Sequence, residues 1–265
     1  MMWVATRSEL VRLVQPRLLI GWFGLVAMFA ALINVVMFSM TGGDGPPAGP
    51  GVAFPDAATL ASRDGLVIGM SAASSMFGIV TLSFWAIATA ADYSSGLIRL
   101  MVAAQPRRWK LLVGKVAALA AVTAVATVVA TMVNVGVAPV AAEAAGIDTS
   151  GWQSADLPGT LLQAWGNAFL AALVWGVIGL VLATFTRTSA IAISVGAGWV
   201  LLVESIVAVA FDDARSWLPG TVLTAVAQGG NATLSHGSAI GLGAAYVALG
   251  LAAAVIVLTR RDVTD

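Results

Sequence analysis

Residues 157–186 read LPGTLLQAWGNAFLAALVWGVIGLVLATFT, thirty consecutive positions without an ionisable side chain. An α-helix rises about 1.5 Å per residue, so roughly 20 apolar residues cross the hydrocarbon core of a bilayer. This stretch is therefore long enough to span a membrane as a single helix.

Five further segments meet the same criterion. Residues 18–43, 65–91 and 116–142 carry no ionisable side chain, residues 188–211 carry only Glu204, and residues 237–259 are uncharged. The sequence therefore predicts an all-α polytopic membrane protein with six transmembrane helices in one domain covering residues 1–265. The expected spans lie at about 18–40, 66–91, 112–136, 160–184, 190–211 and 237–259, within a few residues at each end.

The composition agrees with this fold class and excludes several kinds of site. Hydrophobic residues make up 59% of the chain and charged residues 10%, against about 25% charged in an average soluble domain. Cysteine is absent and His236 is the one histidine, so disulfides, thiolate metal sites and histidine metal clusters are excluded. The first apolar run exceeds the core of a secretory signal, so we expect the first helix to be retained.

The basic residues predict the orientation of the chain in the membrane. With the N-terminus in the cytoplasm, eleven of the 13 basic residues fall in inner segments, and only Arg63 and Arg215 fall in outer loops. Lys and Arg are enriched in cytoplasmic loops. We therefore expect both termini to lie in the cytoplasm.

Three segments outside the spans are amphipathic. Residues 1–16 place Trp3 and several Val and Leu residues on one helical face, which indicates a helix lying in the inner membrane interface; a basic leader without helical structure is the alternative. A short helix is expected from about Ser94 to Ala104, ended by Pro106. From the residues alone, this helix either docks a partner or rests at the interface. Another short helix is expected after Pro219, either dipping into the outer leaflet or capping the bundle.

Several residues around the Ser94–Ala104 segment form a pattern that resembles a known family. The pattern begins with an acid at the inner end of span 2, Asp92, which is followed by a glycine, Gly96, and a basic residue, Arg99. It continues with the run Pro106-Arg107-Arg108 and ends with the pair Gly114-Lys115 at the start of span 3. Together with the basic N-terminus, Leu218-Pro219 and the closing TRRD at 259–262, these residues resemble the permease subunit of a bacterial ABC-2 type ABC transporter. That family more often has Glu at position 92 and Thr at position 97.

The resemblance implies partners, a location and a coupling site. Such a permease lies in the bacterial cytoplasmic (inner) membrane among lipids, pairs with a second permease copy or a paralogue, and binds two copies of a cytosolic ABC ATPase subunit. ATP and Mg²⁺ would be held by that ATPase, and no cofactor, metal or nucleic acid by this chain. The implied ATPase-coupling residues are Asp92, Gly96, Leu97, Arg99, Leu100, Met101, Pro106, Arg107, Arg108, Lys115 and Arg187.

The sequence gives no sign of catalysis by this chain. A P-loop requires G-x-x-x-x-G-K-[ST], whereas Gly114-Lys115 is followed by Val116 and preceded by Trp109 at the required glycine position. We therefore expect no enzymatic activity here and expect ATP hydrolysis in a separate subunit. The expected function is that of an exporter permease for an apolar or amphipathic cargo such as a drug, lipid or peptide.

Polar residues inside the spans leave alternatives open. Glu204 is the one carboxylate within a span and is a candidate for a pathway or gate, or for a structural role. Asn34 and Asn134 are expected to form helix–helix hydrogen bonds. The alternative functions are a secondary transporter and an accessory or pore subunit that is not coupled to ATP.

Overall fold

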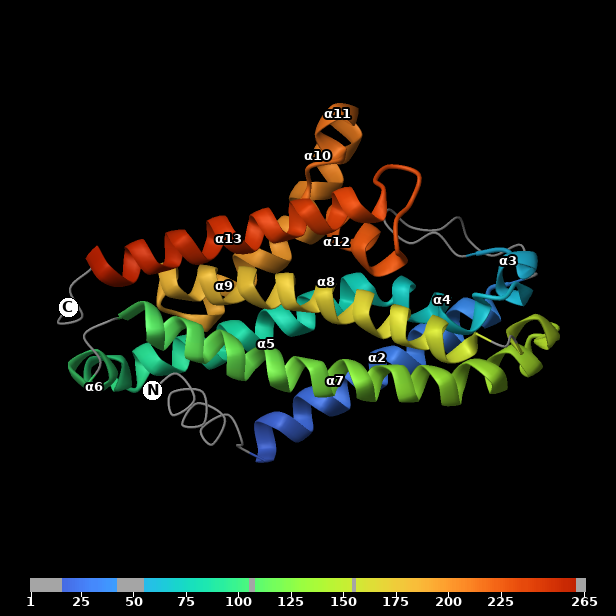
Figure 1. Ribbon diagram of the computed structural model, residues 1–265, viewed down its shortest axis with the longest axis horizontal. Helices are drawn as coiled ribbons and strands as arrows, with labels where there is room; N and C mark the ends of the chain where they lie inside the picture. Colours follow the sequence, from blue (N-terminus) through green and yellow to red (C-terminus); the bar gives the residue numbers. More distant parts are fainter. Residues whose placement is uncertain (1–15, 42–54, 105–107, 154–155, 261–265) are drawn as a thin grey trace.

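The computed structural model describes residues 16–41, 55–104, 108–153 and 156–260 (Figure 1). Within these ranges the regular structure is entirely helical, and six helices are long and apolar enough to cross a membrane. The expected all-α fold with six candidate spans is confirmed, and the chain is a multi-pass membrane protein. The expected interfacial helix at 1–16 lies almost wholly outside the described residues, and Pro16 begins the first described helix.

The long helices differ in detail from the expected spans. Their bounds are α2 (Pro16–Ser39), α4 (Gly65–Ala72) followed by α5 (Ser74–Ser94), α7 (Arg108–Ala144), α8 (Leu157–Thr186), α9 (Ser189–Gly198) followed by α10 (Glu204–Ala210), and α13 (His236–Arg260). The second span is divided at Ala73. The fifth contains a π-helical turn, η2 (Trp199–Val203). The third continues past residue 136 through Pro139 and is 37 residues long.

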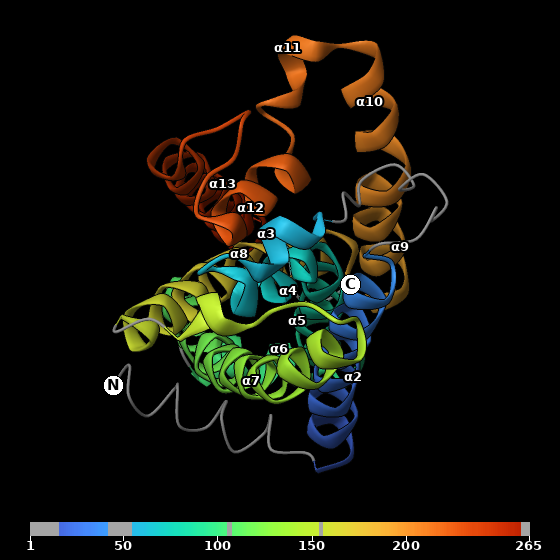
Figure 2. The same cartoon turned by 90° about the vertical axis from the view of Figure 1, so that its right-hand side faces the viewer.

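Helix α8 lies at the centre of the bundle and packs most closely on α5 (Figures 1 and 2). A Cβ atom at Gly176 of α8 would overlap the indole ring of Trp85 on α5, and a Cβ at Gly78 of α5 would overlap Trp175 on α8. Each tryptophan therefore fills the notch left by a glycine of the other helix. This reciprocal packing lets the two helices approach without a cavity, as van der Waals association in a membrane requires.

Helices α2 and α7 are joined by a buried polar contact. The Asn34 side-chain amide donates to Asn134 Oδ1 at 2.8 Å, and the Asn134 amide donates to the Leu66 carbonyl at 2.7 Å. The predicted hydrogen bonding of the two asparagines between helices is thus confirmed. Because both side chains are buried, this contact joins α2, α4 and α7 at one level of the bundle.

The segment between the last two spans folds back into the bundle. Helix α11 (Asp212–Arg215) follows α10, and Figure 2 shows both projecting away from α8. Helix α12 (Pro219–Gln228) begins at the predicted proline and packs against α8 and α13, with Val222, Leu223 and Val226 buried. The segment therefore adds a short, buried helix to the core.

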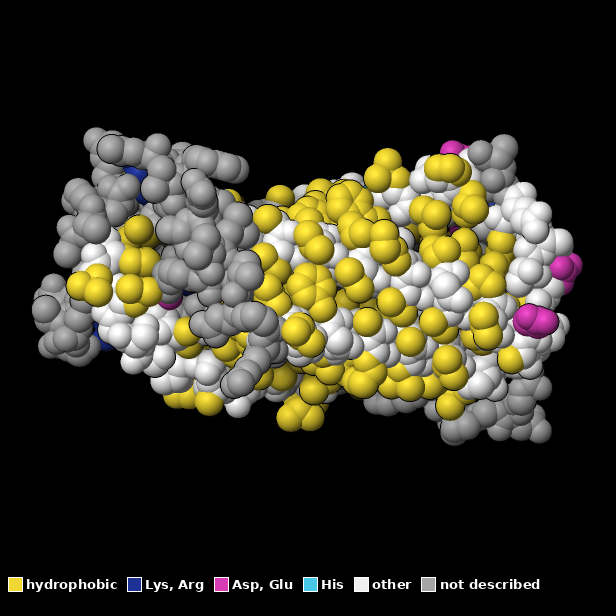
Figure 3. All heavy atoms as spheres, turned by 90° about the horizontal axis from the view of Figure 1, so that it is seen from below, with side chains coloured by type: hydrophobic (Ala, Val, Ile, Leu, Met, Phe, Trp, Pro, Cys, Tyr) yellow, Lys and Arg dark blue, Asp and Glu magenta, His cyan; other side chains and the backbone are white. Residues whose placement is uncertain are grey.

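The two ends of the bundle carry opposite charge. The basic end holds α6 (Leu97–Ala104), the start of α7 and the end of α13, at the left of Figure 1. The acidic end, at the right, holds α3 (Ala57–Ala61), η1 (Ser150–Trp152) and the start of α8. Figure 3 shows apolar side chains between a left end with Lys and Arg and a right end with acids.

Candidate functional site

The first candidate site is the short helix α6 at the basic end, together with the turn and the helix contacts that connect it to the bundle. Helix α5 ends at Ser94, and Gly96 follows with φ +68°, a left-handed conformation that glycine adopts at little cost. The Gly96 N–H donates to the Tyr93 carbonyl at 3.1 Å and so completes the turn. The chain then starts α6 in a new direction at Leu97.

Helix α6 is strongly amphipathic. Ile98 is 8% exposed and Leu100 is 69% exposed, while Leu97 and Met101 are half-buried. One side of α6 therefore anchors the helix on the bundle, and the opposite side presents an apolar side chain. Arg99 also lies in α6, whereas the predicted coupling residues Pro106 and Arg107 lie outside the described residues.

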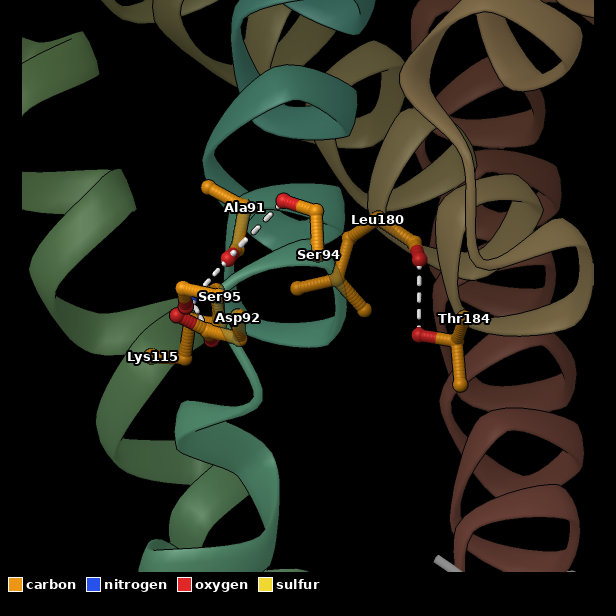
Figure 4. A network of polar contacts seen from close by, with 7 residues as sticks. All are labelled: Ala91, Asp92, Ser94, Ser95, Lys115, Leu180 and Thr184. Atoms are coloured by element: carbon orange, nitrogen blue, oxygen red, sulfur yellow. Dashed lines mark hydrogen bonds and ion pairs between the residues drawn. The ribbon is translucent and has the colours of Figure 1, made fainter. Parts of the chain in front are cut away.

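An ion pair joins the end of α5 to α7, close to the start of α6 in the chain (Figure 4). Lys115 of α7 donates to the Asp92 carboxylate in the last turns of α5, and both side chains are buried. Beside it, Ser95 Oγ donates to the Ala91 carbonyl at 2.6 Å. Removing one partner of a buried ion pair leaves an uncompensated charge and typically costs about 3–5 kcal/mol. The pair therefore fixes the end of α5, from which α6 extends.

Two other predicted coupling residues lie at helix ends. Arg108, the first residue of α7, donates to the carbonyl of Leu258 near the end of α13 at 2.6 Å. Arg187 closes α8 in a left-handed conformation with φ 59°, and its N–H donates to the Ala183 carbonyl at 2.8 Å. The structure thus places both residues at helix ends, outside α6 itself.

Glu204 does not belong to this group, because it lies in α10 beside the start of α12. Its carboxylate is 6% exposed and accepts hydrogen bonds from the Gly220 N–H at 2.8 and 2.9 Å and from Trp199 Nε1 at 3.0 Å. The first N–H groups of a helix lack intrahelical acceptors, and a carboxylate is favourable there. These contacts favour the structural role left open for Glu204, as the anchor of α12.

A second candidate site is a cavity at the acidic end, which the sequence reasoning missed. The cavity has a volume of about 170 Å³ and lies between α4, α8 and the end of α12. Its polar lining comprises Asp64, Ser71, Thr160, Gln163, Asn167 and Gln228. The spacing of Thr160, Gln163 and Asn167 on one face of an otherwise apolar helix is the signal that could have revealed it.

The described side chains do not form a metal-binding site. Within that part of the chain, no group of three or more His, Cys, Asp or Glu side chains could hold a metal ion. The two candidate sites are therefore the short helix α6 with its exposed apolar side chain at one end and a small polar cavity at the other.

These features define a helical, multi-pass membrane protein with a short amphipathic helix at its basic end. Comparison with known families places it further: the chain belongs to the family described as "Protein of unknown function (DUF2705)", whose model matches residues 26–264. No curated protein matches the chain.

Proposed function

We propose that this protein is the membrane-spanning permease subunit of an ATP-driven ABC-2 type transporter that exports an apolar or amphipathic cargo. A separate cytosolic ABC ATPase would hold ATP and Mg²⁺ and act on two permease chains, either two copies of this one or this one and a paralogue. The protein would lie in the bacterial cytoplasmic membrane with both termini in the cytoplasm.

The observation that carries the proposal is the exposed apolar side chain of α6 and the firm connection of this helix to two spans. An apolar side chain at Leu100 is exposed on a short helix at the end of the bundle that bears the basic residues. Helix α6 follows directly from α5, whose end is tied to α7 by Asp92 and Lys115. A push on α6 would therefore be passed to two spans rather than absorbed by a loose linker. Transmission through rigid helices is what switching between two bundle arrangements requires.

The charge distribution supports the same orientation. Basic residues favour the cytoplasmic side of a membrane, where the ATPase and its nucleotide would be found. The basic end is also the end that carries α6 (Figure 1). The proposed dock and the proposed cytoplasmic face therefore coincide.

The proposal is tested by charging α6 at Leu97 and Met101, the half-buried apolar residues next to the exposed Leu100. Leu97→Glu combined with Met101→Glu should leave the protein inserted in the membrane but abolish its co-purification with the ABC ATPase. Ser94→Glu adds one such negative charge at an exposed position outside α6 and should leave co-purification intact. Undiminished co-purification of the double variant would contradict the proposed dock.

The ATP-independent alternatives predict a different result. A secondary transporter or an accessory or pore subunit would keep its activity when the P-loop lysine of the ATPase is replaced. The permease proposed here would lose transport completely in that experiment.

A further inference from the structure

We propose that the cavity at the acidic end is a binding site for an amphiphile with a primary ammonium head group. The cavity lies near the acidic end and is bounded by three separate helices, α4, α8 and α12. Its volume of about 170 Å³ is roughly ten times the ~10–15 Å³ that a single water needs on the same kind of measure. It is therefore large enough to receive a head group with part of an alkyl chain.

Asn167 is the residue that points to a ligand. Its side chain is 7% exposed and lines the cavity. Its amide forms no hydrogen bond with the groups that the structure describes, and its polar atoms are not among the side-chain atoms that are sealed from solvent without a partner, so they are reached from the cavity. Asn167 lies ten residues into α8, about 15 Å from the start of the helix. A hydrogen-bonding group of a ligand that enters to this depth can pair with the amide.

Asp64 gives the site its charge preference. This exposed carboxylate lines the cavity and makes no capping hydrogen bond to α4, although it is placed at the helix start. The neighbouring Arg63 pairs instead with Asp156, at 3.1 Å. None of the described residues lining the cavity is basic. The site therefore attracts a cation and repels an anion.

The remaining lining residues match the two parts of such a ligand. A primary ammonium group has three donors and no acceptor, and the carboxylate, amide and hydroxyl oxygens of the lining are acceptors. The apolar lining includes Val67, Met70 and Ala164, which would contact a hydrocarbon chain. Such a head group could belong to a membrane phospholipid or to a free amphiphile. Use of the site for cargo rests on the proposed export function, whereas binding itself does not.

The test uses octylammonium as the probe and 1-octanol as its uncharged match. The full chain is placed in phosphatidylcholine nanodiscs, and binding is measured by titration calorimetry with empty nanodiscs subtracted. We expect one saturable site per chain and about fivefold tighter binding of octylammonium than of octanol, from one carboxylate near the surface. Asp64→Asn should remove that preference, because the residue is exposed and its replacement leaves the packing unchanged.

Two further variants complete the design. Asn167→Leu should weaken binding of both probes about tenfold, through the lost hydrogen bond and the filled cavity. Glu143→Gln removes an exposed acid that does not line the cavity and should leave both affinities unchanged. The proposal is overturned if octylammonium does not bind above the empty nanodiscs, or if it binds Asp64→Asn as tightly as the original protein.

A second set of nanodiscs identifies the source of the head group. If the natural ligand is a phospholipid, added phosphatidylethanolamine should compete and raise the apparent Kd of octylammonium. If it is a free amphiphile, the Kd should stay the same. Either result supports the site. These measurements need no ATPase, so their failure would leave the proposed coupling through α6 untouched, and loss of that coupling would not alter the binding.

Discussion

Asp92 and Lys115 form a buried ion pair that joins the last turns of α5 to the beginning of α7. The two residues are 23 positions apart in sequence, with α6 between them. The segment from α5 to α7 is therefore a closed loop whose base is an ion pair and whose tip is the amphipathic helix α6.

Replacing one member of this pair should destabilise the protein much more than replacing both. Asp92→Leu or Lys115→Leu alone leaves a buried charge without its partner and should cost about 3–5 kcal/mol, whereas the double change replaces both charges with apolar groups. Thermal unfolding in detergent of the four proteins measures the coupling free energy. Strictly additive effects of the two single changes would show that the pair does not hold the loop.

Glu204 should act on stability through α12. Glu204→Leu removes the acceptor of the partly buried Gly220 N–H and leaves that donor without its partner, at a cost toward the lower end of about 1–3 kcal/mol. Glu204→Gln keeps an acceptor oxygen and should be milder. The midpoint of thermal unfolding distinguishes this role from a gate, because loss of transport in Glu204→Leu at unchanged stability would indicate a gate instead.

The chain contains no cysteine, so a single introduced cysteine reports the side of the membrane on which it lies. We expect a membrane-impermeant maleimide to label Ser150→Cys at the acidic end in intact cells. It should label Ser94→Cys at the basic end only after the cells are opened. Both serines are exposed, so burial does not limit either reaction. The reverse labelling pattern would mean that the bundle is inverted and that α6 faces away from any cytosolic ATPase.

The helical spans could be predicted because charged side chains are costly in the hydrocarbon core, so a span is visible in the sequence as a long uncharged run. Uncharged runs such as 157–186 need no knowledge of neighbours to be recognised as spans. The short helix before Pro106 and the one starting at Pro219 were also predictable, because proline restricts the backbone next to it. These are local effects.

Features that depend on neighbouring helices could not be predicted. The burial of α12 depends on contacts between segments far apart in sequence. The same is true of the cavity. In the sequence Asn167 is a single polar residue of a predicted helix, and only the packing of α4 and α12 beside α8 shows that it lines a cavity. The continuation of α7 through Pro139 and the π-helical turn before Glu204 have no signal in the pattern of apolar residues. Asp92 and Lys115 are each predicted from the sequence as coupling residues, but the sequence does not predict that the two side chains form an ion pair.

The central claim is that a cytosolic ATPase binds α6, and cross-linking from position 100 tests this claim most directly. A photoreactive amino acid at position 100, where the side chain is 69% exposed, is activated in cells, and the cross-linked peptides are identified by mass spectrometry. A matched probe at Leu249 lies on a similarly exposed apolar surface of α13 within its span. We predict that position 100 cross-links to a P-loop ATPase and that position 249 does not. Cross-links from position 100 to lipid alone would contradict the claim.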